Sequence, residues 1–298
     1  MAHTLEILSH RTETLTSIRG IVHTMKTLSA INASPYEHAA QAIEAYHRTV
    51  LEGFSAFLHR NGALELASKA SPKKVVVVFG SDHGLCGGYN ETLATEVSKY
   101  LETHGPEKPA AYVLCVGARM DDALTAQGVL TGQTLLPPAS ADGIGRLAGV
   151  LATRIEDIAR QSRPDELAVT LAFTERAAEG LQEPVLRNLL PLDPKLIAGL
   201  LDRPWVSRSL PEFTLPAKDL LAELIIGHLF ASLFRASAEA MVTENAARLS
   251  LMQQAEQSID DRLEELKSEA RTVRQTEITT ELLDVIAGFE ALSRRRSS

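Results

Sequence analysis

The longest unbroken helical pattern in the chain runs from Ala217 to about Leu292 without a proline. At ~1.5 Å per residue, a continuous helix of this length would reach on the order of 110 Å, several times an ordinary globular helix. Its apolar residues recur at steps of four and three, the spacing of a coiled-coil seam. They are Ile259, Leu263, Leu266, Ala270 and Val273, followed after a one-residue phase shift by Ile278, Leu282, Val285, Phe289 and Leu292. Because a single helix cannot bury such a stripe by itself, the pattern predicts a helical partner.

A second helical pattern lies at the other end of the chain, from about Leu5 to Leu58. Its seam positions are Leu8, Leu15, Ile18, Val22 and Met25, with Ile21 and Leu28 widening the apolar stripe. Pro35 interrupts this pattern. Because proline lacks a backbone donor and disfavours helix at the residue before it, we expect a kink or break there.

Between the two helical ends, from Ser71 to about Pro204, short apolar runs alternate with helical stretches. The runs at 74–79 and 111–116 lack polar alternation, as expected of strands buried on both faces of a parallel sheet. Further elements are expected as a helix ending near Leu101, helices at 118–126 and 144–161, and a strand at 166–173. Five prolines between Leu190 and Pro216 predict an irregular boundary loop.

The two apolar seams lie on either side of an intact α/β region in the sequence. The simplest way to bury both seams is to pack the two helices against each other as an antiparallel pair. We therefore predict an α/β fold class: an antiparallel coiled coil of long N- and C-terminal helices plus a Rossmann-like α/β domain with a mainly parallel sheet. The predicted domains are an N-terminal coiled-coil helix at 1–68, the α/β domain at 69–210 and a C-terminal coiled-coil helix at 211–298.

Composition and charge narrow the function classes. With 45% apolar and 23% charged residues, the chain has the balance of a soluble globular protein. A formal net charge of −8 gives no global electrostatic reason to bind nucleic acid, and we expect no such partner. We find no apolar run near the roughly 20 residues that cross a bilayer and no apolar signal core, so a cytoplasmic protein is expected. Cys86 and Cys115 lack CxxC spacing and the histidines form no cluster with carboxylates, so we expect neither a disulfide nor a metal site.

A glycine-rich turn follows the first expected strand and opens a helix. Its residues are Ser81, Asp82, His83, Gly84, Leu85, Cys86, Gly87, Gly88, Tyr89 and Asn90. Turns of this kind often bind phosphate, because free amides and the helix dipole converge there. However, no lysine follows the paired glycines as in GxxxxGK[ST], and the spacing is not GxGxxG. The sequence favours the alternative, in which Gly84, Gly87 and Gly88 permit a tight turn and close packing of helix on sheet.

Cys86 in this turn suggests a second enzymatic interpretation, because thiols near a helix start are acidified and Asp82 and His83 lie close in sequence. Residues this close in sequence seldom point at one another in a turn, and no oxyanion site can be argued. A buried structural cysteine is the better interpretation, and we expect no cofactor.

Several stretches together resemble one family. The turn at 81–90 resembles the signature that follows the first sheet strand in F-type ATP synthase gamma subunits. Residues 244–249 and 274–282 resemble that family's two most recognisable helical stretches, and residues 285–292 resemble its ending. Within the turn, the signature residues are Asp82, Gly84, Leu85, Cys86, Gly87, Gly88 and Asn90. These motifs stand in the family's order and cover nearly the whole chain.

The resemblance implies a non-catalytic rotor. In that family the terminal helices form an asymmetric coiled coil inside a hexamer of alpha and beta subunits. The α/β domain forms a foot on the membrane c-ring beside the epsilon subunit. Rotation of this central stalk couples ion flow through the ring to ATP synthesis or hydrolysis in the hexamer, which holds the nucleotide and magnesium sites. The implied location is peripheral, at the cytoplasmic face of the cell membrane.

Six positions match family residues that contact the hexamer or lie beside such residues. Met25 matches the methionine beside the acidic lever loop of the catalytic subunits, and Lys26 follows it. Arg274, Gln275, Thr279 and Glu281 match positions that hydrogen-bond a catch loop. A guanidinium beside an amide suits such a polar grip. The first helix departs from the family, since it has few bases after Met25 and Lys26 stands where an acid is common, which indicates a divergent branch.

Two other functions stay open at this point. A stand-alone nucleotide- or phosphate-binding α/β protein would use the turn at Gly84–Gly88 and would bind its ligand as an isolated chain. A non-rotary coiled-coil scaffold would keep its partners whatever residues stand at Arg274 and Gln275.

Overall fold

The computed structural model describes residues 2–62, 73–104, 111–160, 167–177, 181–205 and 207–296. The chain divides into two compact units. Unit 1 comprises the chain up to Leu28 together with the chain from Leu249 onward, and unit 2 comprises Ser29–Arg248. The division falls within both long helices, so each helix contributes a segment to each unit.

The two long helices predicted from the sequence are present. Helix α1 spans Ala2–Asn61 and helix α6 spans Ala217–Arg296. A kink or break was expected at Pro35, and the helix does not break there: α1 continues through this residue. Tertiary packing outweighs the loss of one backbone donor, since the adjacent Tyr36 is buried in a cluster with Ile144, Ala238 and Val242.

Unit 1 is an antiparallel helical pair. Arg19 pairs with Asp260 at 2.5 Å, and seven residues further along α1 Lys26 pairs with Glu256. Partner numbers fall along α6 as they rise along α1, which defines the antiparallel direction. The buried apolar side chains of this pair are Leu8, Val22, Met252, Leu263 and Leu266.

Unit 2 contains a five-stranded sheet in the order β3-β2-β1-β4-β5. The strands are β1 Lys73–Phe79, β2 Tyr112–Val116, β3 Gln133–Leu135, β4 Leu167–Arg176 and β5 Gln182–Leu190. Neighbouring strands are parallel except β4 and β5, which are antiparallel. The mainly parallel sheet is therefore confirmed, but the sequence analysis missed β3 and β5, which are respectively very short and mostly half-exposed.

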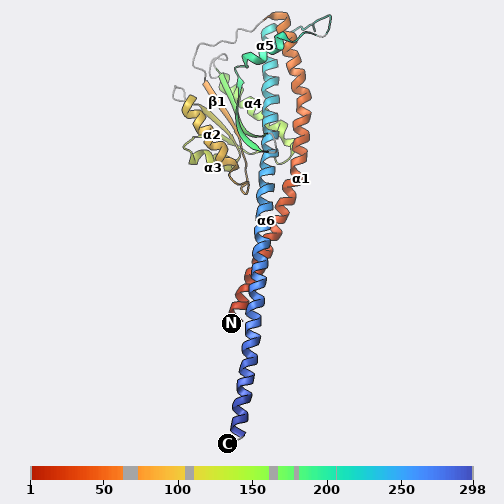
Figure 1. The fold of residues 1–298 in the computed structure, drawn as a ribbon. Helices are drawn as coiled ribbons and strands as arrows, with labels where there is room; N and C mark the ends of the chain where they lie inside the picture. Colours follow the sequence, from red (N-terminus) through yellow and green to blue (C-terminus); the bar gives the residue numbers. More distant parts are fainter. Residues whose placement is uncertain are drawn as a thin grey trace. The chain divides into compact units, whose positions relative to one another are not determined.

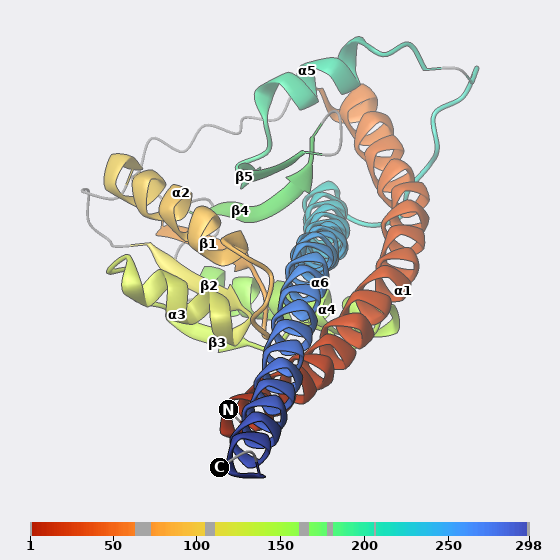
Figure 2. The same ribbon diagram turned by 60° about the horizontal axis from the view of Figure 1, so that its bottom comes forward.

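Helices cover both faces of this sheet (Figures 1 and 2). They are α2 Tyr89–His104 and α3 Ala118–Ala126 on one face, with α4 Ile144–Arg160 and part of α6 on the other. Strand β1 shows why its apolar run does not alternate. Val75 and Val77 pack toward α4 and α6, whereas Val76 and Val78 pack toward α2 and α3.

The proline-rich stretch after β5 was expected to be irregular, but it contains a helix, α5, at Pro194–Asp202. Asp193 caps this helix by accepting a hydrogen bond from the Lys195 amide at 2.8 Å, and proline stands at the first helical position, where it is favourable. Ile197 and Leu200 of α5 pack against Phe54 of α1. Proline here begins a helix rather than excluding one.

One helix among the described residues is long and apolar enough to pass a membrane-span test by length and composition. It lies in α6 and contains an 18-residue window of mean hydropathy 1.4, of which 39% is buried. The sequence analysis found no such run. Core helices pass the same test, and Leu229 and Leu233 of α6 belong to the core of unit 2, so this is weak evidence for a membrane span.

Candidate functional site: the signature turn and the helical pair

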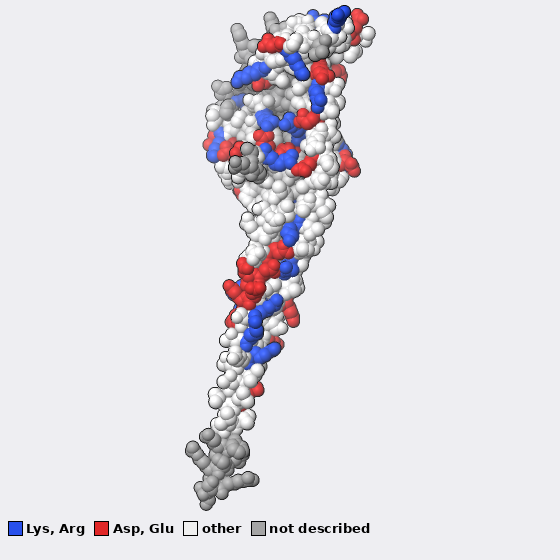
Figure 3. Space-filling view, turned by 45° about the vertical axis from the view of Figure 1, so that its right-hand side comes forward, with Lys and Arg blue, Asp and Glu red and all other residues white. Residues whose placement is uncertain are grey.

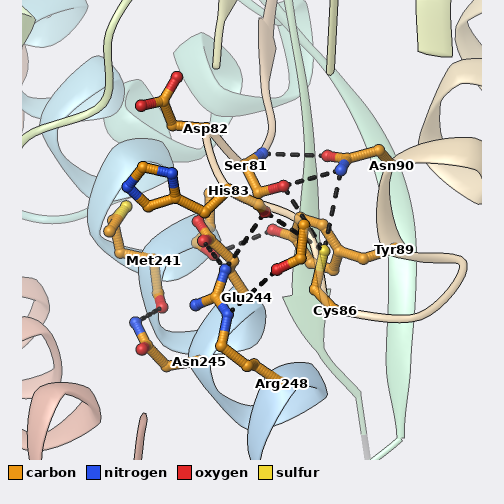
Figure 4. A network of polar contacts seen from close by, with 12 residues as sticks. Ser81, Asp82, His83, Cys86, Tyr89, Asn90, Met241, Glu244, Asn245 and Arg248 are labelled. Atoms are coloured by element: carbon orange, nitrogen blue, oxygen red, sulfur yellow. Dashed lines mark hydrogen bonds and ion pairs between the residues drawn. The ribbon is translucent and has the colours of Figure 1, made fainter. Parts of the chain in front are cut away.

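The signature turn, Ser81–Asn90, is held together by its own polar groups (Figure 4). The Ser81 amide donates to Asn90 Oδ1 at 3.0 Å, and Asn90 Nδ2 donates to Ser81 Oγ at 2.7 Å. Cys86 Sγ lies 3.5 Å from Ser81 Oγ and 3.8 Å from Asn90 Nδ2. All three residues are buried. Asn90 therefore closes the turn from the first residues of α2, a role that explains its place in the signature.

Only one of the three turn glycines shows the expected conformational need. Gly87 has φ +64°, whereas Gly84 and Gly88 have ordinary room for a side chain. The close approach occurs instead at two glycines that the sequence analysis did not single out. A Cβ on Gly117, which has φ +108°, would lie 2.5 Å from the Ser81 carbonyl oxygen, and one on Gly80 would lie 2.5 Å from Met120. These two glycines seat the start of α3 against the turn.

The turn does not carry the chemistry of a cysteine nucleophile. Burial raises the pKa of the Cys86 thiol, which opposes formation of a thiolate. Asp82 points away from the thiol and accepts a hydrogen bond from the Ala118 amide at 3.2 Å (Figure 4). The structural interpretation of Cys86 is therefore the better one. Among the described residues, there is no group of three or more His, Cys, Asp or Glu that could hold a metal ion.

One large apolar side chain of the signature faces outward. Leu85 is 54% exposed and has φ +64°, a left-handed conformation that a leucine adopts only under constraint. It stands beside Gly84 at the tip of the turn.

The second family-like stretch, 244–249, meets the turn in space (Figure 4). Arg248 of α6 donates to the backbone carbonyls of His83 and Gly84 at 3.4 and 3.5 Å and to Glu244 Oε1 at 2.6 Å. Burial raises the pKa of Glu244, while the Arg248 guanidinium acts in the opposite direction. The sequence analysis treated the two motifs separately. A Glu and an Arg at i, i+4 can pair with each other, so the spacing in the sequence gives no signal of the contact with the turn.

The six expected hexamer contacts all lie in unit 1, in two groups. Met25 and Lys26 of α1 are partly buried, and the Lys26 ammonium is engaged by Glu256, which also lies 2.8 Å from His23 Nδ1. The second group, Arg274, Gln275, Thr279 and Glu281, is exposed on α6. A hollow of about 270 Å³ on this part of α6 is lined by Thr272, Gln275, Thr276, Thr279 and Thr280.

The structure places most of the predicted seam up to Val273 inward, but the predicted continuation at Ile278, Leu282 and Val285 is exposed. Leu8, Val22, Leu263 and Leu266 are buried, and Leu15, Ile259 and Val273 are partly buried. Ile18, however, lies outside the seam and is 42% exposed. The side chain of the neighbouring Arg19 is 43% exposed and reaches Asp260 of α6 with its guanidinium. Heptad spacing alone did not show that Ile18 lies outside the seam.

Charged side chains are unevenly distributed along unit 1 (Figure 3). Acidic side chains gather on one stretch of the pair, and basic side chains follow toward the C-terminal end. In the sequence, residues 260–265 hold four acids and one base, and residues 267–274 hold three bases and one acid.

Comparisons with known proteins agree with these motifs. A sequence profile of the ATP synthase family matches residues 4–292. An ATP synthase gamma chain of Desulforapulum autotrophicum is 28% identical over 76% of this chain and 78% of its own length. Another, of Geotalea uraniireducens, is 25% identical over 97% of this chain and 98% of its own length.

Solved structures show the same fold. A chain of the Euglena gracilis mitochondrial ATP synthase, solved as OSCP, F1 and c-ring in rotational state 3, aligns with a TM-score of 0.61 at 17% identity, covering 100% of this chain and 97% of that one. A chain of the rotor of the same enzyme aligns with a TM-score of 0.58 at 17% identity, covering 93% and 100%. The match of the family profile to nearly the whole chain shows that this protein belongs to the ATP synthase gamma family.

Proposed function

We propose that the chain is the central-stalk rotor subunit of an F-type ATP synthase, a non-catalytic part that couples ion movement through a membrane ring to ATP synthesis or hydrolysis. The observation that carries the proposal is the antiparallel pair of terminal helices in a chain of the gamma family. A rotor needs a stiff shaft that transmits torque. Two helices from the ends of the chain, packed against each other, supply such a shaft.

The proposed partners follow from the relatives. The Euglena gracilis structure contains F1, OSCP and the c-ring, and we transfer the F1 hexamer and the ring to this chain as partners. An epsilon subunit is proposed on the family resemblance alone. The proposed hexamer contacts are Met25, Lys26, Arg274, Gln275, Thr279 and Glu281. Since Glu256 already engages Lys26, this lysine has less freedom to reach an acidic loop than an unpaired one would.

The proposed foot is the α/β domain at 69–210, flanked by coiled-coil helices at 1–68 and 211–298. The proposed location is peripheral, at the cytoplasmic face of the cell membrane, where the subunit is held by the rest of the complex. Fractionation would test this location. The chain should pellet with membranes and be released when the F1 part is stripped from them. A chain that stays with the membrane after stripping and leaves it only in detergent would contradict the proposal.

The test of the rotor function is made in the assembled complex. Replacing Arg274 and Gln275 together by alanine should leave the hexamer able to hydrolyse ATP but remove most of its coupling to ion pumping. Arg271→Ala is the matched control, because Arg271 is an exposed base of the same helix outside the proposed contacts. Fully coupled ATPase in the double variant would remove the assignment of these residues. Failure of the unaltered chain to co-purify with a catalytic hexamer would remove the rotor function itself.

A further inference from the structure

A short segment of α6 receives polar contacts from several parts of the α/β domain. This segment, Glu239–Arg248, is termed the clamp segment below. Its contacts come from the signature turn, from the start of α2, from the end of β4 and from the first residue of β5. All of these residues belong to unit 2, and Arg248 is the last residue of that unit on α6.

The centre of the clamp is a buried hydroxyl network. Tyr89 Oη lies 2.9 Å from the Ala240 carbonyl oxygen and 3.1 Å from Thr243 Oγ1. Thr243 Oγ1 in turn lies 3.0 Å from the Thr174 carbonyl oxygen of β4, and Gln182 Nε2 donates to the Thr243 carbonyl at 3.1 Å. Thr243 is fully buried, and burial raises the pKa of Tyr89, so its phenol stays protonated and able to donate.

Charged contacts flank this network on both sides. Toward the N-terminal side of the segment, Arg176 at the end of β4 donates to Glu239 Oε1 at 2.9 Å. On the other side, the largely buried pair of Glu244 and Arg248 reaches the turn carbonyls of His83 and Gly84. The clamp segment is therefore bonded to the signature turn, β4 and β5 through several residues on the half of its circumference that faces the domain.

The preceding part of α6 is held differently. Its core positions in unit 2 include Leu229, Leu233 and Ala236, which pack against the sheet and α4. Apolar packing of small and branched side chains is non-directional, so it resists separation of the helix more than turning of the helix about its axis. Hydrogen bonds have strict angular requirements, so bonds made by several residues of the segment to fixed groups of the domain oppose such turning.

We propose that the clamp segment is the torque-bearing junction between the α/β domain and α6, with Tyr89 and Arg248 as the positioning residues that prevent α6 from turning within the domain. The signature turn then serves as one of the contact surfaces of this junction rather than as a ligand site. This inference rests on the proposed rotor function, because torque is present only if the chain rotates. It gives a reason why two of the family-like motifs, 81–90 and 244–249, meet in space.

The experiment uses the assembled, membrane-bound complex and measures ions pumped per ATP hydrolysed while the opposing ion gradient is raised. Arg248→Met keeps the aliphatic stem but removes every donor, and Tyr89→Phe removes one hydroxyl. Each should leave ATP hydrolysis without a gradient close to that of the unaltered complex, yet lower the pumping ratio against a high gradient by about threefold or more. Arg248→Lys should recover part of that loss, since it restores the charge.

Arg235→Met is the matched control, because Arg235 also lies on α6 in unit 2 but pairs with Glu44 of α1 rather than with the turn. It should leave the pumping ratio unchanged. A purely structural role of Tyr89 and Arg248 would lower the melting temperature or the yield of complex without changing the ratio, and that result would overturn the inference. If Arg248→Met does not assemble, Tyr89→Phe decides the question by the same ratio. Loss of pumping by the unaltered chain would instead contradict the rotor function.

Discussion

The two units hold the same two helices together by different means. In unit 2, α1 and α6 share apolar cores with the rest of the domain, and Phe54, Leu233 and Ala238 are at most 2% exposed. In unit 1, over the described residues, the helices pack against each other along a narrow seam with partly exposed ion pairs. The comparison indicates that unit 2 sets the global stability, whereas unit 1 opens locally at lower cost.

The ion pairs between the helices also reverse their sign between the units. In unit 1 the bases Arg19 and Lys26 lie on α1 and the acids lie on α6. In unit 2, Glu44 of α1 pairs with Arg235 of α6. A large slip of α1 along α6 would bring like charges together, so the reversal disfavours misregistered pairing even though each surface pair contributes little.

The largest expected effect is in the core of unit 2. Leu233→Ala should lower the free energy of global unfolding by about 4 kcal/mol, because Leu233 is fully buried and the cavity cannot collapse easily. Leu266→Ala in unit 1 should cost less, although Leu266 is only 2% exposed, because two helices can close the gap more freely. Chemical denaturation of the isolated chain measures both. Equal losses of unfolding free energy in the two variants would mean that unit 1 unfolds together with unit 2 rather than separately.

A charge placed in the seam should destabilise unit 1 without destabilising unit 2. Leu263→Asp places an unpaired carboxylate at a position that is 7% exposed and should weaken the helical pair by about 3 kcal/mol. Hydrogen exchange should become faster in residues 249–273 while the strands of unit 2 stay protected. The neighbouring Glu264→Asp, on the exposed side, should change neither. Unaltered exchange in the first variant would show that the seam register is wrong.

Acid should weaken unit 2 through a histidine pair in which His228 is buried and His47 is half-buried. His47 Nε2 and His228 Nδ1 lie 3.1 Å apart between α1 and α6, and burial lowers the pKa of His228 to about 4. Its pKa is about 6.5 in an unfolded chain, so the unfolded state binds the proton more tightly and stability falls as the pH drops from 6.5 toward 4. The loss between pH 7 and pH 5 should be about 2 kcal/mol.

Urea unfolding at several pH values measures this dependence. His228→Gln should flatten the curve in that window even if the variant is less stable at pH 7. An equally steep curve would place the titrating group elsewhere.

The smallest effect should come from the ion pairs of unit 1. Asp260 lies beside Arg19, which holds the pKa of this carboxyl below its usual value. The resulting stabilisation is present above the carboxyl's unfolded pKa and is lost as the pH falls through its folded pKa. Arg19→Met should increase exchange in unit 1 slightly at low salt and not at high salt, because salt screens exposed charges. Arg11→Met, another exposed base of α1, serves as the control, and a difference that persists at high salt would indicate packing rather than charge.

The amino-acid sequence by itself determined the elements with strong periodicity. The long helix from Ala217, the buried strand at β1 and the mainly parallel sheet follow from spacing and apolar runs, because these patterns report how many faces of an element are covered. Family motifs in the sequence also indicated the turn and the helical stretch near Glu244 as distinctive. Their physical partners were not visible in either motif alone.

Tertiary structure decided what local pattern leaves open. Helix α1 continues through Pro35 beside the buried Tyr36, and Ile18 is exposed, although propensity and heptad spacing favour other outcomes. The contact of Arg248 with the signature turn joins residues that lie more than half the chain apart. Such long-range contacts depend on how buried polar groups find partners across the fold, and a linear pattern records the groups but not which partner each one reaches.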